Sequence, residues 1–231
     1  MRREGELLAA LDHPGLSRTL HLDLEGERPY IEMEHVDGRR LSTLVRRRGR
    51  ADAQTAARIG RGLAATLHYV HTEGVLHLDV KPSNVIVGRA ARLIDFSVAR
   101  RIGRARRISG FVGTDAFMAP EQADPSLWAT IGPKTDVWGL GATLYYALAA
   151  RRPHARGDRH AAGAVRFPQL VESPAPLDPT LHAASLAQLI MQSLARSPED
   201  RPSMRELCGR FDDLATNARA GPSICSSSIN G

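Results

Sequence analysis

Apolar residues recur at helical spacing along much of the chain, which predicts that helices make up most of it. The clearest stretch is residues 53–71. Its apolar positions are three or four residues apart and form one stripe: Ile59, Leu63, Leu67 and Val70. Residues 137–150 are apolar nearly all round, which predicts a helix buried inside the domain. Shorter patterns predict further helices at residues 4–11, 41–48, 181–194 and 203–214.

Short apolar runs separated by turn residues predict a few strands in the first hundred residues. Residues 16–24 and 29–34 flank the turn at residues 25–27 and predict one hairpin. Residues 85–87 and 93–94 flank Gly88 and predict a second, smaller hairpin. Residues 96–120 show no periodicity and therefore predict a long loop, a feature that in compact domains is typically functional or disordered.

Composition narrows the class of protein. The 231 residues are 42% hydrophobic and 24% charged, which is typical of a globular domain and excludes a disordered, collagen-like or coiled-coil chain. The longest apolar run has 14 residues, so we expect no membrane segment. Two cysteines cannot form a disulfide framework, and a cytoplasmic location in a reducing compartment is expected.

The net charge of +6 invites the hypothesis of a nucleic-acid partner, but its distribution argues against one. Only Lys81 and Lys134 are lysines among the 31 basic residues, and the arginines are spread along the chain. Phosphate-binding surfaces are usually clustered and interleaved with aromatic residues, which make up only 5% of this chain. We expect no nucleic-acid partner.

The segment HLDVKPSN, residues 77–84, places three chemically useful side chains in one predicted loop. Phosphoryl transfer needs a carboxylate to orient a hydroxyl nucleophile, a cation near the moving phosphoryl group and an oxygen ligand for magnesium. Asp79, Lys81 and Asn84 supply these groups, and Asp95, after the small hairpin, could be a second magnesium ligand.

These residues belong to a series of motifs that resembles one family. The motifs HLDVKPSN, DFS and APE follow one another in order, the last within GTDAFMAPEQ. They are joined by a hinge-like segment at residues 30–36, an aspartate at 136 and an Arg-Pro pair at 201–202. The chain resembles the eukaryotic-like (Hanks-type) serine/threonine protein kinases of bacteria over nearly its whole length.

The resemblance implies an α+β, protein-kinase-like fold with a mostly helical C-terminal lobe and a truncated small β lobe. Residues 1–36 would be the remnant of the N-terminal lobe with the hinge, residues 37–215 the helical lobe, and residues 216–231 a flexible tail. Glu121 and Arg201 would form a buried structural ion pair, and Asp136 would hydrogen-bond the backbone of the catalytic loop.

The resemblance also implies transfer of the γ-phosphate of ATP to Ser/Thr hydroxyls of protein substrates, with ATP and Mg²⁺ as cofactors. Asp79, Lys81 and Thr114 would be the catalytic group: Asp79 orients the hydroxyl, Lys81 balances phosphate charge, and Thr114 contacts both. Asn84 and Asp95 would hold magnesium. Main-chain groups of Glu34 and Val36 would meet adenine, beyond Met33 at the gatekeeper position.

The sequence departs from the family pattern in ways that keep an alternative open. No glycine-rich strand pair or phosphate-binding strand lysine precedes the hinge, so we expect a chain truncated at its start, and residues 1–231 alone to phosphorylate weakly or not at all. Leu78 replaces an arginine and Ser97 a glycine. Because of these departures, a pseudokinase acting as a scaffold or binding module is the alternative function.

Two other classes agree less well with the motifs. Small-molecule kinases of the antibiotic or choline type share a His-x-Asp…Asn loop but lack the long loop that ends in Ala-Pro-Glu. A nucleic-acid-binding module would rest on charge alone.

Overall fold

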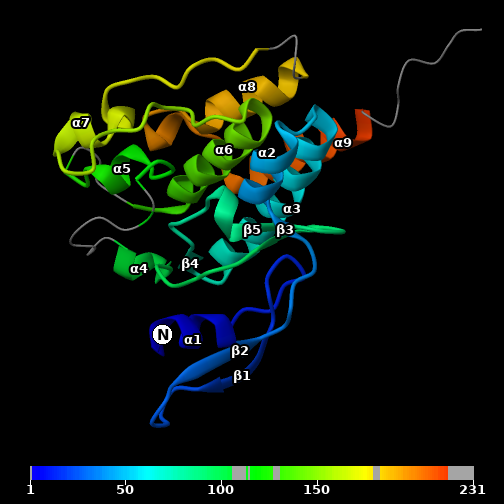
Figure 1. Cartoon of the computed structure of the whole chain (residues 1–231), viewed down its shortest axis with the longest axis vertical. Coiled ribbons are helices and arrows are strands. Elements are labelled where there is room, and N and C mark those ends of the chain that lie inside the picture. Colours follow the sequence, from blue (N-terminus) through cyan, green and yellow to red (C-terminus); the bar gives the residue numbers. More distant parts are fainter. Residues whose placement is uncertain (1, 106–112, 114, 127–130, 179–182, 218–231) are drawn as a thin grey trace, which may run out of the picture.

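The computed structural model describes residues 2–105, 113, 115–126, 131–178 and 183–217. A large helical body and a smaller part make up the molecule, and the smaller part lies at one end of the body (Figure 1). This arrangement confirms the expected kinase-like fold with a helical C-terminal lobe and a small N-terminal β lobe.

The smaller part consists of helix α1 (Arg2–Ala9) and a hairpin of strands β1 (Thr19–Asp23) and β2 (Tyr30–Met33). The strands are antiparallel, with Asp23 opposite Tyr30, as the sequence predicts. The Asp23 carboxylate accepts the backbone N–H groups of Glu25 (3.1 Å) and Gly26 (2.8 Å), which closes the turn.

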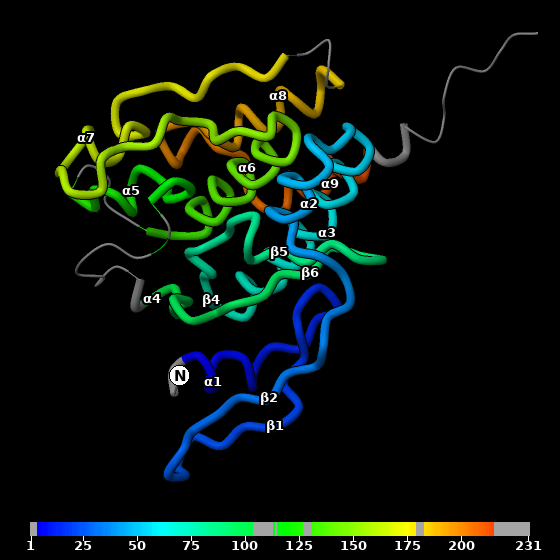
Figure 2. The backbone as a smooth tube through the Cα atoms, viewed as in Figure 1, coloured from blue at the N-terminus to red at the C-terminus, as the bar shows by residue number. Residues whose placement is uncertain are grey.

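The connection between α1 and β1, which contains His13 and Gly15, fixes the smaller part to the helical body. The Gly15 carbonyl accepts the N–H of Leu93 at 2.8 Å. A Cβ at Gly15 would lie 1.8 Å from Oγ1 of Thr66, so no side chain fits at this position. The ring of His13 stacks on that of Tyr69, with centroids 5.0 Å apart. Figure 2 shows the backbone leaving α1 through this connection before it enters the hairpin.

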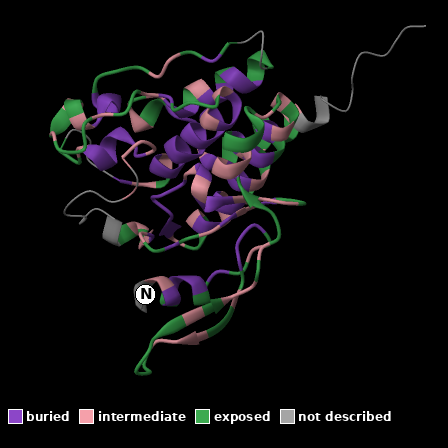
Figure 3. Cartoon of the chain, in the orientation of Figure 1, coloured by how far each residue is buried: buried purple, intermediate pink, exposed green. Residues whose placement is uncertain are grey.

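Five longer helices form the helical body among the described residues: α2 (Leu41–Arg48), α3 (Ala53–Thr72), α6 (Pro133–Ala149), α8 (Ala184–Ser193) and α9 (Met204–Asn217). Their positions confirm the helices predicted from periodicity. The core runs along α6, whose large side chains Trp138 and Tyr145 are both buried. Figure 3 shows buried residues concentrated along α6 and where it packs against α3 and α8.

Short elements surround the core. Those before residue 106 are β3 (Arg39–Arg40), β4 (Val75–Leu76), η1 (Pro82–Asn84), β5 (Val85–Val87), β6 (Ala91–Leu93), β7 (Arg100–Arg101) and α4 (Ile102–Ala105). Those after it are α5 (Pro120–Ala123), α7 (Gly163–Arg166), η2 (Pro168–Leu170) and η3 (Pro198–Asp200). Strands β3, β5 and β6 form one antiparallel sheet, in which Val85 faces Leu93 and confirms the second hairpin.

The expectation of an unbroken loop at residues 96–120 is wrong in its first part. Strand β7 pairs with β4, with Arg101 opposite Val75, and α4 follows directly. A two-residue strand carries no side-chain periodicity, so the residue pattern does not reveal it. At the C-terminal end, α9 reaches Asn217, so the first two residues of the expected tail are helical and residues 218–231 lie outside the described residues.

In the described residues, no helix combines the length and the apolar character needed to cross a membrane.

The ion pair expected between Glu121 and Arg201 is present and fully buried. Arg201 donates through Nη1 and Nη2 to the two oxygens of Glu121, at 2.7 and 2.8 Å, and both side chains are 0% exposed. Arg201 also donates to the carbonyls of Ala195 (2.8 Å), Lys134 (2.9 Å) and Arg196 (3.0 Å). The pair therefore joins α5 to the start of α6 and to the segment before α9.

Removing one partner of this pair should destabilise the fold strongly. In Glu121→Gln the Arg201 guanidinium stays buried without its counter-ion, and we expect the free energy of unfolding to fall by about 3–5 kcal/mol. The exposed pair of Arg61 and Asp212 provides the control, since Arg61→Gln should cost about 1 kcal/mol or less. Urea unfolding measures both, and equal losses in the two variants would contradict this interpretation.

Candidate active site

The backbone of the predicted catalytic loop is held by one buried carboxylate. Asp136, in the first turn of α6, accepts the N–H groups of His77 (2.9 Å) and Leu78 (2.8 Å) through its two oxygens. This contact confirms the role expected for Asp136. Leu78 has φ 65°, a left-handed conformation that costs a non-glycine residue about 1–2 kcal/mol. The two hydrogen bonds hold the backbone in this sharp turn, immediately before Asp79.

Two histidines surround this carboxylate. His71, from the last turn of α3, places Nε2 2.8 Å from Oδ2 of Asp136. Burial alone would raise the pKa of Asp136, but the hydrogen bond and charge of His71, together with contacts to His77, lower it. Asp136 is therefore ionised and able to accept all three hydrogen bonds.

His77 is fully buried and stays neutral at neutral pH. Burial lowers its pKa and outweighs the opposing charges of Asp136 and Asp79. Its hydrogen bonds agree with this state, since Nδ1 accepts the N–H of Asp79 (3.3 Å) while Nε2 lies 3.4 Å from the carbonyl of Ile94. The ring also packs edge-on against Phe96, with centroids 4.7 Å apart.

Three of the predicted site residues meet in the loop that follows. The Lys81 ammonium donates to Oδ2 of Asp79 at 2.6 Å. Nδ2 of Asn84 donates to the same oxygen at 3.2 Å and to the Asp79 carbonyl at 3.1 Å. The side chains of Asp79 and Lys81 are 8% and 19% exposed, so they form a partly shielded cluster that solvent can still reach.

Asp95 lies on the next segment, which the same loop positions. The N–H of Ile94 donates a hydrogen bond to the Asn84 carbonyl at 2.9 Å. This hydrogen bond holds the residue before Asp95 against the loop. Asp95 has φ 70°, and its Oδ1 accepts both the hydroxyl (2.6 Å) and the N–H (3.2 Å) of Ser97. The serine that replaces the family's glycine therefore contacts the predicted metal ligand directly.

Helix α1 brings a second carboxylate to this segment. Burial raises the pKa of Glu4, the negative charge of Asp95 raises it further, and a hydrogen bond with the backbone of Phe96 opposes both effects. Glu4 is thus half-buried beside the Asp-Phe-Ser segment.

The two hinge residues differ in whether their main-chain groups already form hydrogen bonds within the protein. The N–H of Glu34 donates to the Arg18 carbonyl at 2.9 Å, and its own carbonyl accepts the hydroxyl of Ser17 at 3.0 Å. Its side chain pairs with Arg92. Val36, by contrast, makes no main-chain hydrogen bond within the residues that the structure describes.

Two further residues of the site were not among those predicted from the sequence. Gln122 is buried; its Oε1 accepts the Ala119 N–H at 3.0 Å and its Nε2 donates to the Leu78 carbonyl at 2.9 Å. It therefore joins the Ala-Pro-Glu segment to the catalytic loop. His71, described above, could have been suspected because it lies four positions after Leu67 of the buried stripe. Thr114 lies outside the described residues.

The donor atoms fit a small, hard cation. Asn84 directs its amide nitrogen at Asp79, which leaves its amide oxygen for another partner, and Ser97 occupies only Oδ1 of Asp95. Magnesium takes one or two protein oxygens and completes its coordination with phosphate oxygens and water. Within the described residues no cluster of three or more His, Cys, Asp or Glu side chains could hold a metal ion.

Comparison with known proteins agrees with this geometry. The family model described as "Protein kinase domain" matches residues 1–210, and the chain therefore belongs to the protein kinase family. It is similar to the serine/threonine-protein kinases PknB of Mycobacterium leprae (31% identity over 87% of this chain) and PknK of Mycobacterium tuberculosis (36% over 83%). PknA of M. tuberculosis is 31% identical over 95% of the chain. The chain spans 33%, 17% and 51% of these three relatives, respectively.

The buried neutral His77 should make the fold sensitive to acid. Its pKa in the folded state lies below the ordinary 6.5, so the unfolded chain binds more protons, and stability is lost as the pH falls below about 6.5. His77→Gln should reduce this loss, by at most about 1.4 kcal/mol per pH unit for one proton. Urea unfolding at pH 7.5 and 5.5 measures the difference.

The exposed His160 is the control for that measurement. His160→Gln should keep the pH dependence of the unmodified chain. A pH dependence in His77→Gln as steep as that of the unmodified chain would show that His77 is not the group that titrates.

Proposed function

We propose that the chain carries the active site of an ATP-dependent protein kinase that transfers the γ-phosphate of ATP to Ser/Thr hydroxyls of protein substrates. One observation carries the proposal: the Asp79 carboxylate contacts both the Lys81 ammonium and the Asn84 amide in a loop held by Asp136. Membership of the protein kinase family supports it.

In this proposal each side chain has a separate task. Asp79 accepts a hydrogen bond from the substrate hydroxyl, orients its oxygen toward the phosphorus and takes up its proton. Lys81, already beside Asp79, places its positive charge where the transferred phosphoryl group carries negative charge. Thr114 is proposed to contact both residues, as the resemblance implies.

Magnesium would be held by the amide oxygen of Asn84 and the carboxylate of Asp95. When bound, the ion neutralises charge on the phosphates and aligns them with the nucleophile. Positioning these two ligands is the task of the chain itself, through the Ile94–Asn84 backbone hydrogen bond and the contact of Ser97 with Asp95.

Adenine is proposed to meet the hinge at Glu34 and Val36. Val36 offers both its N–H and its carbonyl, whereas Glu34 offers only the remaining lone pair of its carbonyl. ATP as the phosphoryl donor agrees with the cytoplasmic location that the sequence predicts.

The second candidate is a pseudokinase that binds a partner without phosphoryl transfer. Ser97, which stands beside Asp95 where the family has a glycine, is the departure from the family pattern that favours it. The intact contact between Asp79 and Lys81 favours catalysis, since a binding module has no need for a paired carboxylate and ammonium in its loop.

Replacing the proposed hydroxyl-orienting group separates the two candidates. In Asp79→Asn we expect transfer of labelled phosphate from ATP to a mixture of Ser- and Thr-containing peptides to fall by about 10²- to 10⁴-fold. Affinity for a fluorescent ATP analogue with magnesium should stay within a few-fold, because Asp79 is not proposed to bind the nucleotide.

The matched control is Asp212→Asn, an exposed carboxylate on α9. It should change neither transfer nor nucleotide affinity. Transfer by the unmodified chain, even if weak, that is lost in Asp79→Asn would exclude the pseudokinase. Equal transfer by the unmodified chain and Asp79→Asn would remove Asp79 from the mechanism.

The hydroxyl of Ser97 should tune the magnesium site. Ser97→Ala removes its hydrogen bond to Asp95 while keeping the backbone, and loss of a group that orients a metal ligand typically costs about 10- to 100-fold in metal affinity. We therefore expect the magnesium concentration that half-saturates nucleotide binding to rise by at least about tenfold. An unchanged or lower midpoint would mean that the hydroxyl does not position Asp95 for the ion.

A further inference from the structure

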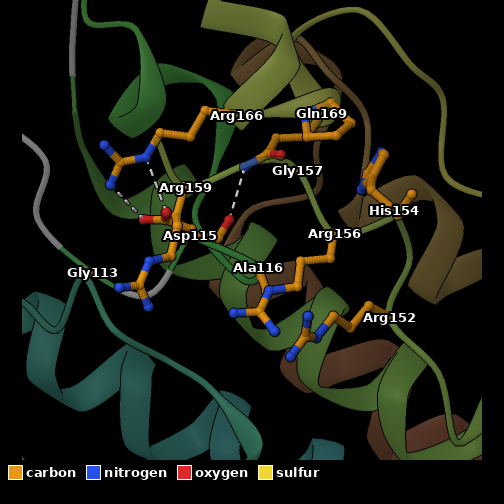
Figure 4. Close-up of a pocket in the computed structure, with 12 residues that line it drawn as sticks. Gly113, Asp115, Ala116, Arg152, His154, Arg156, Gly157, Arg159, Arg166 and Gln169 are labelled. Carbon is orange, nitrogen blue, oxygen red and sulfur yellow. Dashed lines mark hydrogen bonds and ion pairs between the residues drawn. The ribbon is translucent and has the colours of Figure 1, made fainter. Parts of the chain in front are cut away.

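A cavity of about 400 Å³ lies beside the catalytic loop, outside the nucleotide site proposed above. Residues from three segments far apart in the sequence line it: Gly113, Asp115 and Ala116; Arg152, His154, Ala155, Arg156, Gly157 and Arg159; and Arg166, Pro168 and Gln169. Figure 4 shows that the side chains of Arg152, Arg156 and Arg159 extend toward the side of the cavity formed by Gly113 and Ala116.

Positive charge is in excess in this cavity. Its one acidic lining residue, Asp115, is paired with Arg166, which donates from Nε at 3.0 Å and from Nη2 at 3.3 Å. Arg152, Arg156 and Arg159 are exposed and have no carboxylate within ion-pair distance in the described part of the chain. The residues outside that part include no Asp or Glu. Within the part of the chain that the structure describes, three guanidinium charges of the cavity are therefore left without a carboxylate partner.

The walls that carry these charges are fixed by buried contacts. Nε2 of Gln169, which is 4% exposed, donates to the carbonyls of Asp115 (3.1 Å) and Met118 (3.0 Å). The ring of His154 stacks on Trp138 at 5.7 Å, and burial lowers the pKa of His154, so this ring adds no charge of its own at neutral pH. Because these contacts already hold the walls of the cavity in place, little conformational entropy of the protein is lost when a ligand binds.

One end of the cavity touches the catalytic loop. Gly113 has φ 116°, and a Cβ at this position would lie 3.0 Å from the carbonyl oxygen of Leu78, the residue before Asp79. An extended peptide advances about 3.3–3.6 Å per residue. A substrate whose hydroxyl lies at Asp79 can therefore place a residue one to about three positions away in the cavity.

We propose that this cavity selects protein substrates that carry an anionic side chain, either a carboxylate or a phosphorylated Ser/Thr, within about three residues of the phosphorylated hydroxyl. Arg152, Arg156 and Arg159 bind the anion, since guanidinium groups form paired hydrogen bonds with carboxylate and phosphate oxygens. A basic residue at the same place is repelled. The proposal rests on the proposed function, because it assumes that the hydroxyl is bound at Asp79.

Peptide binding, measured without phosphoryl transfer, tests the proposal. Fluorescent peptides with one central serine carry Asp, phosphoserine, Asn or Lys at the positions from one to three residues on either side. Fluorescence anisotropy with the whole chain should show that Asp or phosphoserine peptides bind about tenfold tighter than the Asn peptide, and the Lys peptide weakest. The Asp and phosphoserine arms identify which anion is preferred.

The double variant R156Q/R159Q should lose this tenfold preference. The control R46Q/R47Q removes the same charge from the exposed end of α2, distant in sequence from the cavity, and should keep it. Equal affinity of the anionic and Asn peptides, or an equal loss in both double variants, would overturn the proposal. Anion preference together with equal phosphoryl transfer by the unmodified chain and Asp79→Asn would support the cavity and contradict the proposed function, so the two failures are distinguishable.

Discussion

The geometry of the site depends on one buried carboxylate. Asp136 sits inside the helical core at 1% exposure, where an ionised group is tolerated only if hydrogen bonds replace the water it has lost. Its donors are His71 and the backbone of His77 and Leu78. The contacts that satisfy the carboxylate are therefore also the contacts that shape the loop. The loop cannot relax its left-handed turn without leaving a buried charge unsatisfied.

The same turn links the proposed nucleotide side of the site to the proposed peptide side. Its carbonyl, on Leu78, accepts a hydrogen bond from Gln122 and lies against Gly113. The residue after it, Asp79, meets Lys81 and Asn84. A displacement of this backbone would therefore move the proposed hydroxyl-orienting group and the entrance of the arginine-lined cavity together, which makes Asp136 the point where core packing and chemistry are coupled.

Much of this could be predicted from the sequence, because some signals are local. The apolar stripe of residues 53–71 and the apolar run of 137–150 were enough to locate α3 and α6. The motif residues placed the loop, and the Glu121–Arg201 pair and the Asp136 contact followed from the resemblance to protein kinases. The closeness of Asp79, Lys81 and Asn84 follows from their positions within one short segment.

What could not be predicted depends on contacts between distant residues. The pair of Asp115 and Arg166 joins positions 51 residues apart, in segments without periodicity. Arginines are spread along the whole sequence, so nothing distinguished those of the cavity from solvated ones. Gln122 ends the motif GTDAFMAPEQ, but the motif does not show that its side chain reaches the carbonyl of Leu78, 44 residues earlier in the chain.

The most direct test of the central claim is a crystal structure of the chain with magnesium and a non-hydrolysable ATP analogue. The claim predicts the ion about 2.0–2.1 Å from the amide oxygen of Asn84 and a carboxylate oxygen of Asp95, with the terminal phosphate beside Lys81. A nucleotide bound elsewhere, or phosphates and metal that contact neither Asn84 nor Asp95, would contradict it.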